Sequence, residues 1–309
     1  MPFGEIEKYK SLAFFARQVV EGYITGMHKS PFHGFSVEFA EHRLYNTGES
    51  TRNIDWKLYA RTDKLFVKRF EEETNLRCML MIDNSSSMFF PRERQGDFRN
   101  PNKLTFSVYA AAVLVELFVR QRDAFGLTLF SSAVDMQTPV RSNEVHQNYV
   151  LSLLQNVLEE KHDDRAEKRT TDISQALHMV AEQMKRRSLV VLFTDAFQSD
   201  GKRDALFDAL RHLRHARHEV ILFHTYDRSR EVELSFDNKP YHFIDMETDR
   251  HVKLFPAEAA QLYRQRTWQR FEELRSRAMQ YRIDYVPVDI NMGFDQVMQP
   301  YIIKRSRHF

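Results

Sequence analysis

Residues 77–87 read RCMLMIDNSSS, a short apolar run followed directly by an aspartate, an asparagine and three serines. Near-continuous apolar runs of this length are typical of strands that are buried on both faces of a parallel sheet. Four more segments have the same form: AFGLTLF (124–130), SLVVLFTD (188–195), EVILFHTY (219–226) and YRIDYVPVD (281–289). The sequence therefore predicts five central strands.

Segments with helical spacing of apolar residues lie between these runs. They cover residues 103–121, 143–160, 173–186, 203–217 and 257–280. Strands that alternate with helices predict an α/β fold, here a doubly wound, mostly parallel sheet with helices on both faces. A last helix is expected near 294–305, where Pro300 should kink or interrupt it.

The first 75 residues have a different pattern. Residues 5–27 predict an amphipathic helix, and the segments SVEFAEHRLY and KLFVKRFEEE predict strands of a small β-rich extension. We expect two domains, residues 1–75 and residues 76–309. The second should contain an inserted hairpin at about 230–256, with a turn at DNKP.

Composition limits the class of protein. The chain has 28% charged residues, a net charge of +2 and a single cysteine, Cys78. We therefore expect no nucleic-acid partner and a reducing, cytoplasmic location. No stretch approaches the roughly 18 to 20 apolar residues that a membrane span needs. Phosphate-binding loops, a serine-hydrolase elbow and an H-E-x-x-H helix are absent from the sequence, so we expect no enzyme.

Polar residues in three predicted loops should lie at one edge of the sheet. Asp83, Ser85 and Ser87 follow the first strand, Asp195 ends another strand, and Thr171 precedes the helix DISQALHMV. In open α/β sheets, ligands bind outside the carboxyl ends of the strands. Carboxylate and hydroxyl oxygens suit a divalent cation that keeps some of its water, which is Mg²⁺ in the first place, with Mn²⁺ or Ca²⁺ possible.

This arrangement resembles the von Willebrand factor A domain and its metal-ion-dependent adhesion site. The resemblance implies that Ser85, Ser87 and Thr171 contact the cation, and that Asp83 and Asp195 act directly or through water. The family has glycines before its threonine, whereas this chain has Arg169 and Thr170, so either threonine could be the ligand. Ala196 stands where the family often has glycine.

The N-terminal region is similar to the MoxR-associated branch of these domains, long catalogued as a domain of unknown function. The matching residues are Gly34, Phe39, Arg43, Tyr45, Gly48, Arg52, Asp55, Trp56, Ala60, Arg61, Thr62 and Lys68. The resemblance implies a non-enzymatic adaptor that works with a MoxR-type AAA+ ATPase. A client protein would donate a Glu or Asp to the metal, for chaperone-like assembly or activation.

Each of these features also has an alternative interpretation. Asp-Ser-Ser after a strand can be a polar turn and helix cap, and the metal site can be vestigial. The same aspartates could instead serve a metal-dependent hydrolase together with a nearby histidine. Arg43, Arg52 and Arg61 can fix the β extension or bind a partner, and the basic face of 203–217 can simply be solvated.

Overall fold

The computed structural model describes residues 11–27, 42–44, 56–68, 76–94, 96–160, 172–185, 187–196, 203–247 and 250–306. The chain divides into two units, residues 26–75 and the remainder. In the smaller unit, strands β1 (His42–Leu44) and β2 (Phe66–Lys68) pair antiparallel. Helix α2 (Trp56–Thr62), which the sequence did not predict, lies between them in the chain.

The larger unit contains a six-stranded sheet in the order β10-β7-β6-β3-β4-β5. Its five parallel strands are those predicted: β3 (Arg77–Asp83), β4 (Ala124–Phe130), β6 (Leu189–Thr194), β7 (Glu219–Tyr226) and β10 (Asp284–Asp289). Strand β5 (Val134–Gln137) was not predicted and pairs antiparallel at the edge. The predicted α/β fold is thus confirmed.

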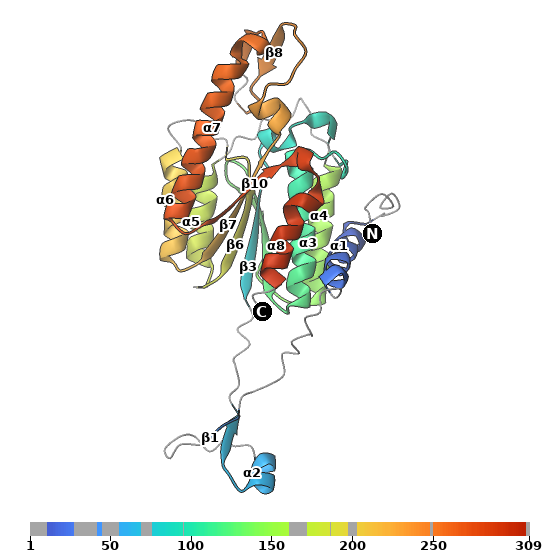
Figure 1. Ribbon diagram of the computed structural model, residues 1–309, viewed down its shortest axis with the longest axis vertical. Helices are drawn as coiled ribbons and strands as arrows, with labels where there is room; N and C mark the ends of the chain where they lie inside the picture. The colour runs from blue at the N-terminus through green and yellow to red at the C-terminus, as the bar shows by residue number, and fades with distance from the viewer. Residues whose placement is uncertain are drawn as a thin grey trace. The chain divides into compact units, whose positions relative to one another are not determined.

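Helices cover both faces of this sheet (Figure 1). One face carries α1 (Leu12–Met27), α3 (Lys103–Arg120), α4 (Glu144–Glu159) and α8 (Phe294–Ser306). The other carries α5 (Ile173–Gln183), α6 (Arg203–His215) and α7 (Pro256–Gln280). Alternate residues of β3 explain the two layers, since Leu80 packs in the first core and Met81 in the second.

Side chains at the helix starts define where three of these helices begin. Asn102, Asn143 and Asp172 each accept a hydrogen bond from a backbone N–H in the first turn of α3, α4 and α5. Helix α8 runs through Pro300, so the expected interruption is wrong, and the alternative of a kink stays a prediction. Met298, Tyr301 and Ile302 are buried on either side of the proline, and this packing compensates for one missing backbone hydrogen bond.

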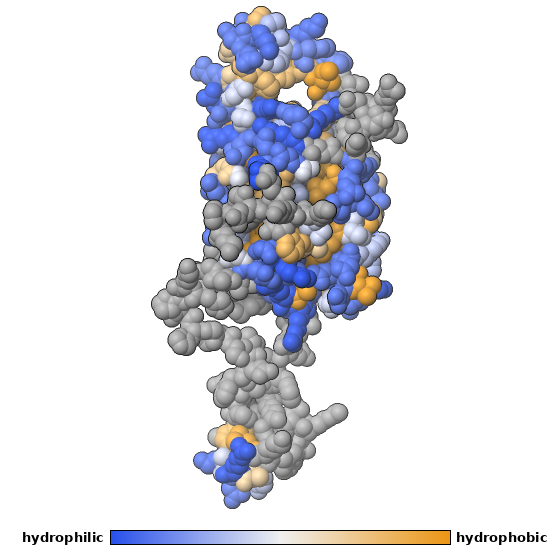
Figure 2. Space-filling view, turned by 90° about the vertical axis from the view of Figure 1, so that its right-hand side faces the viewer, coloured by the Kyte–Doolittle hydropathy of each residue, from blue (hydrophilic) through white to orange (hydrophobic). Residues whose placement is uncertain are grey.

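A hairpin, β8 (Tyr241–Ile244) and β9 (His251–Leu254), follows β7 and precedes α7. Hydrophobic residues are scattered rather than gathered on the face seen in Figure 2, where most of the coloured surface is hydrophilic. The apolar residues are instead concentrated in the two cores, and Cys78 lies buried in β3 as expected. The two cores thus enclose the sheet, whose carboxyl edge carries the candidate site.

Candidate functional site

Asp83 is the last residue of β3, and its side chain is fully buried. Its Oδ1 accepts a hydrogen bond of 3.0 Å from the backbone N–H of Ser85, which turns the chain sharply after the strand. Its Oδ2 accepts a bond of 2.7 Å from the hydroxyl of Thr194 at the end of β6. The pairing of β3 with β6 thus holds the carboxylate in one orientation.

Two serine hydroxyls lie together just beyond Asp83. The Oγ atoms of Ser85 and Ser87 are 3.1 Å apart, and Ser87 is partly exposed where Ser85 is buried. Neighbouring oxygen ligands of an octahedral magnesium ion, each ~2.1 Å from the metal, lie about 3 Å apart. The spacing and chemistry of this pair therefore fit two adjacent corners of such an ion.

Asp195 follows β6 and is only 2% exposed. Its carboxylate Oδ2 accepts a hydrogen bond of 2.8 Å from Nζ of Lys103. Its backbone carbonyl lies 3.0 Å from Nε2 of His224, whose Nδ1 lies 2.8 Å from the hydroxyl of Tyr285. A neutral imidazole that donates through Nε2 and accepts through Nδ1 satisfies both contacts.

Ala196 has a backbone φ of 51°, in the left-handed region where glycine is favoured. Its N–H donates a hydrogen bond of 3.0 Å to the Thr194 hydroxyl, which keeps the strained residue in place. This conformation gives a physical reason for the glycine that the resembled family often has here. The departure to alanine keeps the loop shape at a cost in backbone strain.

The second loop is described only from Asp172 onward. Thr170 and Thr171, the two alternative ligands, lie outside the described residues. The N–H of Asp172 donates a bond of 2.8 Å to the carbonyl of Ser131, just after β4. The start of α5 is therefore anchored to the end of the strand that neighbours β3.

Burial and charge set the electrostatics of the site. Burial raises the pKa of Asp83 to about 7, and the nearby Asp195 carboxylate contributes to the rise. Burial also lowers the pKa of His224 to about 4, so the ring is neutral at pH 7. Two buried carboxylates that repel one another form a region that a divalent cation would stabilise.

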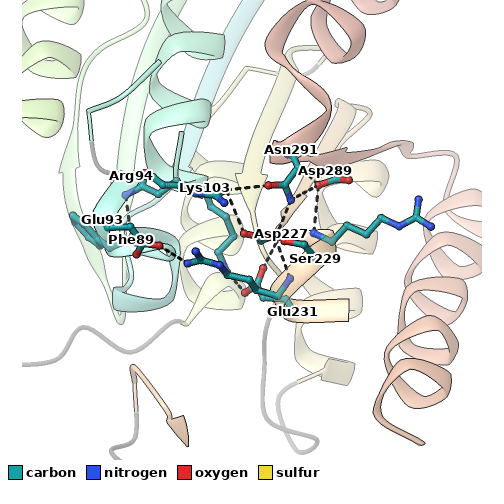
Figure 3. A network of polar contacts seen from close by, with 12 residues as sticks. Phe89, Glu93, Arg94, Lys103, Asp227, Ser229, Glu231, Asp289 and Asn291 are labelled. Carbon is teal, nitrogen blue, oxygen red and sulfur yellow. Dashed lines mark hydrogen bonds and ion pairs between the residues drawn. The ribbon is translucent and has the colours of Figure 1, made fainter. Parts of the chain in front are cut away.

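Several residues of this edge were not predicted from the sequence. Lys103, at the start of α3, bridges Asp195 and Glu231. Arg94 contacts Asp227 and Asn291, while Arg230 pairs with Glu93. Figure 3 shows Glu93, Arg94 and Lys103 facing Asp227, Glu231 and Asn291 across this network.

The only sequence signal for Lys103 is its position, as a charged residue at the start of a helix that is otherwise apolar for most of its length. The network connects the segment after Ser87 to the segment after β7. It thereby holds in place the loop that carries the two serines.

Within the described residues, no group of three or more Cys, His, Asp or Glu side chains is arranged for a metal ion. The candidate site therefore depends on hydroxyl oxygens beside its two carboxylates. Such a mixed set of hard oxygen donors suits Mg²⁺ or Mn²⁺ better than Zn²⁺, which prefers nitrogen and sulfur.

A family model described as "Protein of unknown function DUF58" matches residues 41–275. Among curated proteins, "Uncharacterized protein Rv1480" of Mycobacterium tuberculosis (strain ATCC 25618 / H37Rv) is 26% identical over 229 residues, covering 73% of this chain. "Uncharacterized protein Mb1516" of Mycobacterium bovis matches to the same extent. The chain spans 66% of the length of these relatives.

Two solved structures are also similar. The conserved hypothetical protein BatB from Bacteroides thetaiotaomicron is 15% identical, with a TM-score of 0.43, covering 75% of this chain and 98% of that chain. An aerotolerance-related membrane protein from Bacteroides fragilis is 18% identical, with a TM-score of 0.43, covering 74% and 99%. In the described part of this chain, no helix has the length and apolar character needed to cross a membrane.

Proposed function

The chain belongs to the DUF58 family, and on that premise we propose that it is a metal-dependent protein-binding adaptor without enzymatic activity. The observation that carries the proposal is the cluster at the carboxyl edge of the sheet. There the Asp83 carboxylate is oriented by Ser85 and Thr194, beside a pair of hydroxyls 3.1 Å apart.

In the proposed site, Ser85 and Ser87 bind the ion through their hydroxyls, and Asp83 and Asp195 act directly or through water. Thr171, or Thr170, supplies the remaining side-chain oxygen. A bound Mg²⁺ would supply a positive centre with an exchangeable position for an outside carboxylate. A Glu or Asp of the client would fill that position, and burial of the contact would make recognition depend on the ion.

The hydrogen bonds of His224 support a binding role over hydrolysis. Both ring nitrogens already face partners, the Asp195 carbonyl and the Tyr285 hydroxyl. Because burial lowers the pKa of this ring to about 4, the ring is not an imidazolium acid at pH 7 and is only a weak base. The histidine thus has a positioning role in this proposal rather than a catalytic one.

The proposed partner of the chain is a MoxR-type AAA+ ATPase, with this chain as the link between the ATPase and its client. Support comes from the resemblance of the N-terminal residues to the MoxR-associated branch. The DUF58 match, from residue 41 onward, also joins most of that region to the α/β unit in one family. We place this activity in the cytoplasm, in keeping with a single, buried cysteine, which cannot form a disulfide within the chain.

Thermal unfolding of the purified chain at increasing Mg²⁺ and Mn²⁺ tests the ion site. Because an ion that binds only the folded state must stabilise it, the melting temperature of the wild type should rise with ion concentration. The rise should disappear in the Ser85→Ala/Ser87→Ala variant. Ser152→Ala is the matched control, since this exposed hydroxyl lies on α4 and donates to the carbonyl of Tyr149 in the same helix.

The adaptor role is tested by capturing the AAA+ partner and client with and without EDTA. Capture that survives both EDTA and loss of the two serines would rule out recognition through the ion. Turnover of phosphoesters or peptides by the purified chain with Mg²⁺ or Mn²⁺, lost in Asp83→Asn, would instead favour the hydrolase.

A further inference from the structure

Lys103 is an unusual residue for a protein interior. It is the first residue of α3, yet its side chain is only 1% exposed. Its Nζ lies 2.8 Å from Oδ2 of Asp195 and 2.6 Å from Oε1 of Glu231. Burial by itself would lower the pKa of Lys103, but attraction to the two carboxylates outweighs it, and the pKa lies above its ordinary value. The group is therefore a buried ammonium ion.

Helix formation does not explain this lysine. The first turn of a helix has a positive electrostatic potential, which disfavours a cation. The cap of α3 is supplied by Asn102, whose side chain accepts the N–H of Thr105 at 2.7 Å. A charged residue is rarely buried completely unless it is paired, so the two carboxylates account for the position of Lys103.

The two partners of Lys103 belong to different parts of the edge. Asp195 belongs to the candidate ion site. Glu231 belongs to a short π-helical turn, Arg228–Val232, and its other carboxylate oxygen accepts a bond of 2.7 Å from the N–H of Asp227. Figure 3 shows Lys103 reaching toward this turn from the opposite side of the network. One ammonium is thus shared between the ion site and a neighbouring segment.

We propose that Lys103 sets the affinity of the ion site by acting as a tethered cation whose repulsion of the bound metal is offset by Glu231. The inference rests on the proposed function, because it concerns the same site. The ammonium contacts a carboxylate assigned to the ion, so it must repel a divalent cation placed there. The negative charge of Glu231 partly neutralises the ammonium. Its removal would leave Asp195 as the only carboxylate partner of Lys103 among the described contacts.

Lys103 and Glu231 should therefore have opposite effects on the affinity of the site for the ion. Lys103→Met removes the repulsion and should tighten Mn²⁺ binding by about tenfold, the size expected for one nearby charge even with water-like screening. Glu231→Gln removes the negative charge that offsets the repulsion between Lys103 and the ion. It should weaken Mn²⁺ binding about threefold or more. The double variant loses one charge of each sign and should return to within about threefold of the wild type.

Calorimetric titration of the full chain with Mn²⁺ measures these affinities directly. Glu233→Gln is the matched control, because Glu233 follows the same turn but pairs with Arg228 instead of Lys103. Its affinity should equal that of the wild type. Lys103→Arg keeps the charge and should bind far more like the wild type than like Lys103→Met. Damage to the fold alone would weaken binding, so tighter binding by Lys103→Met has no purely structural explanation.

Unchanged or weaker binding by a folded Lys103→Met variant would overturn the inference. If that variant does not fold, Glu231→Gln decides, and an affinity equal to the wild type overturns it. Two failures can be told apart with Ser85→Ala. If Mn²⁺ binding is lost in Ser85→Ala but is unchanged in Lys103→Met and in Glu231→Gln, the proposed ion site is supported and only the role of Lys103 is overturned. No Mn²⁺ binding by the wild type or any variant removes the ion site as well.

Discussion

The Thr194 hydroxyl donates a hydrogen bond of 2.7 Å to Oδ2 of Asp83, across the parallel pair formed by β6 and β3. The hydroxyl oxygen of Thr194 also accepts a hydrogen bond of 3.0 Å from the N–H of Ala196. Both groups are buried, and the bond goes to a carboxylate, so it is of the stronger kind. One hydroxyl thus orients a proposed ion ligand and the loop that carries Asp195.

Thr194→Val tests this relationship with almost no change in side-chain shape. We expect a loss of about 1 to 3 kcal/mol in the free energy of unfolding, because a buried carboxylate oxygen and a backbone N–H lose their partner. Urea unfolding measures the loss. Thr225→Val is the control, since the described contact of that buried hydroxyl is a weak one to the sulfur of Met88, at 3.7 Å. Equal losses in the two variants would show that the Asp83 contact is not special.

Ala196→Gly should stabilise the protein by up to about 1 kcal/mol. The φ of 51° places Ala196 in a conformation that strains any residue with a Cβ, and glycine removes the strain at some cost in chain entropy. Thermal or urea unfolding measures the change. A clear loss of stability would mean that the alanine methyl group contributes more by packing than it costs in strain.

His224 should make stability fall in mild acid. Its pKa is about 4 in the folded chain and about 6.5 when unfolded, so between these values the unfolded chain binds more protons. The contribution is fully present above pH 6.5. It is lost on acidification toward pH 4 at up to about 1.4 kcal/mol per pH unit.

His224→Gln keeps a side-chain donor but cannot titrate. The difference in unfolding free energy between this variant and the wild type should therefore move in the variant's favour from pH 7.5 to pH 5. A difference that stays constant across this range would show that the ring is not held neutral.

Asp83 should make ion binding depend on pH near neutrality. Its pKa is raised to about 7 by burial and by Asp195, so below pH 7 a proton competes with the cation for the carboxylate. We expect the Mn²⁺ affinity to fall by about tenfold per pH unit below pH 7 and to level off above it. Calorimetric titrations at pH 6, 7 and 8 measure this slope.

Asp83→Asn provides the control for that slope. The variant cannot lose a proton at this position, so any remaining Mn²⁺ binding should be weak and nearly independent of pH in this range. An equally steep slope in the variant would assign the competing proton to another group.

The prediction from sequence was most accurate where a local pattern suffices. Continuous apolar runs identified the five parallel strands because burial on both faces leaves little choice of residue type. Edge strand β5 escaped prediction because its four residues are partly exposed and mixed in character. The expected interruption at Pro300 was wrong for the opposite reason, since packing of its neighbours outweighed a strong local signal.

The sequence by itself determined the parallel sheet, its two layers of helices and the placement of Asp83, Ser85, Ser87 and Asp195 after strands. Those properties follow from short-range periodicity and from the rule that parallel strands end at a common edge. Only the tertiary structure decided that Lys103 meets Asp195 and Glu231, 92 and 128 residues away in the chain. Nothing local specifies such a contact, because it exists only once α3, β6 and the turn after β7 have packed together.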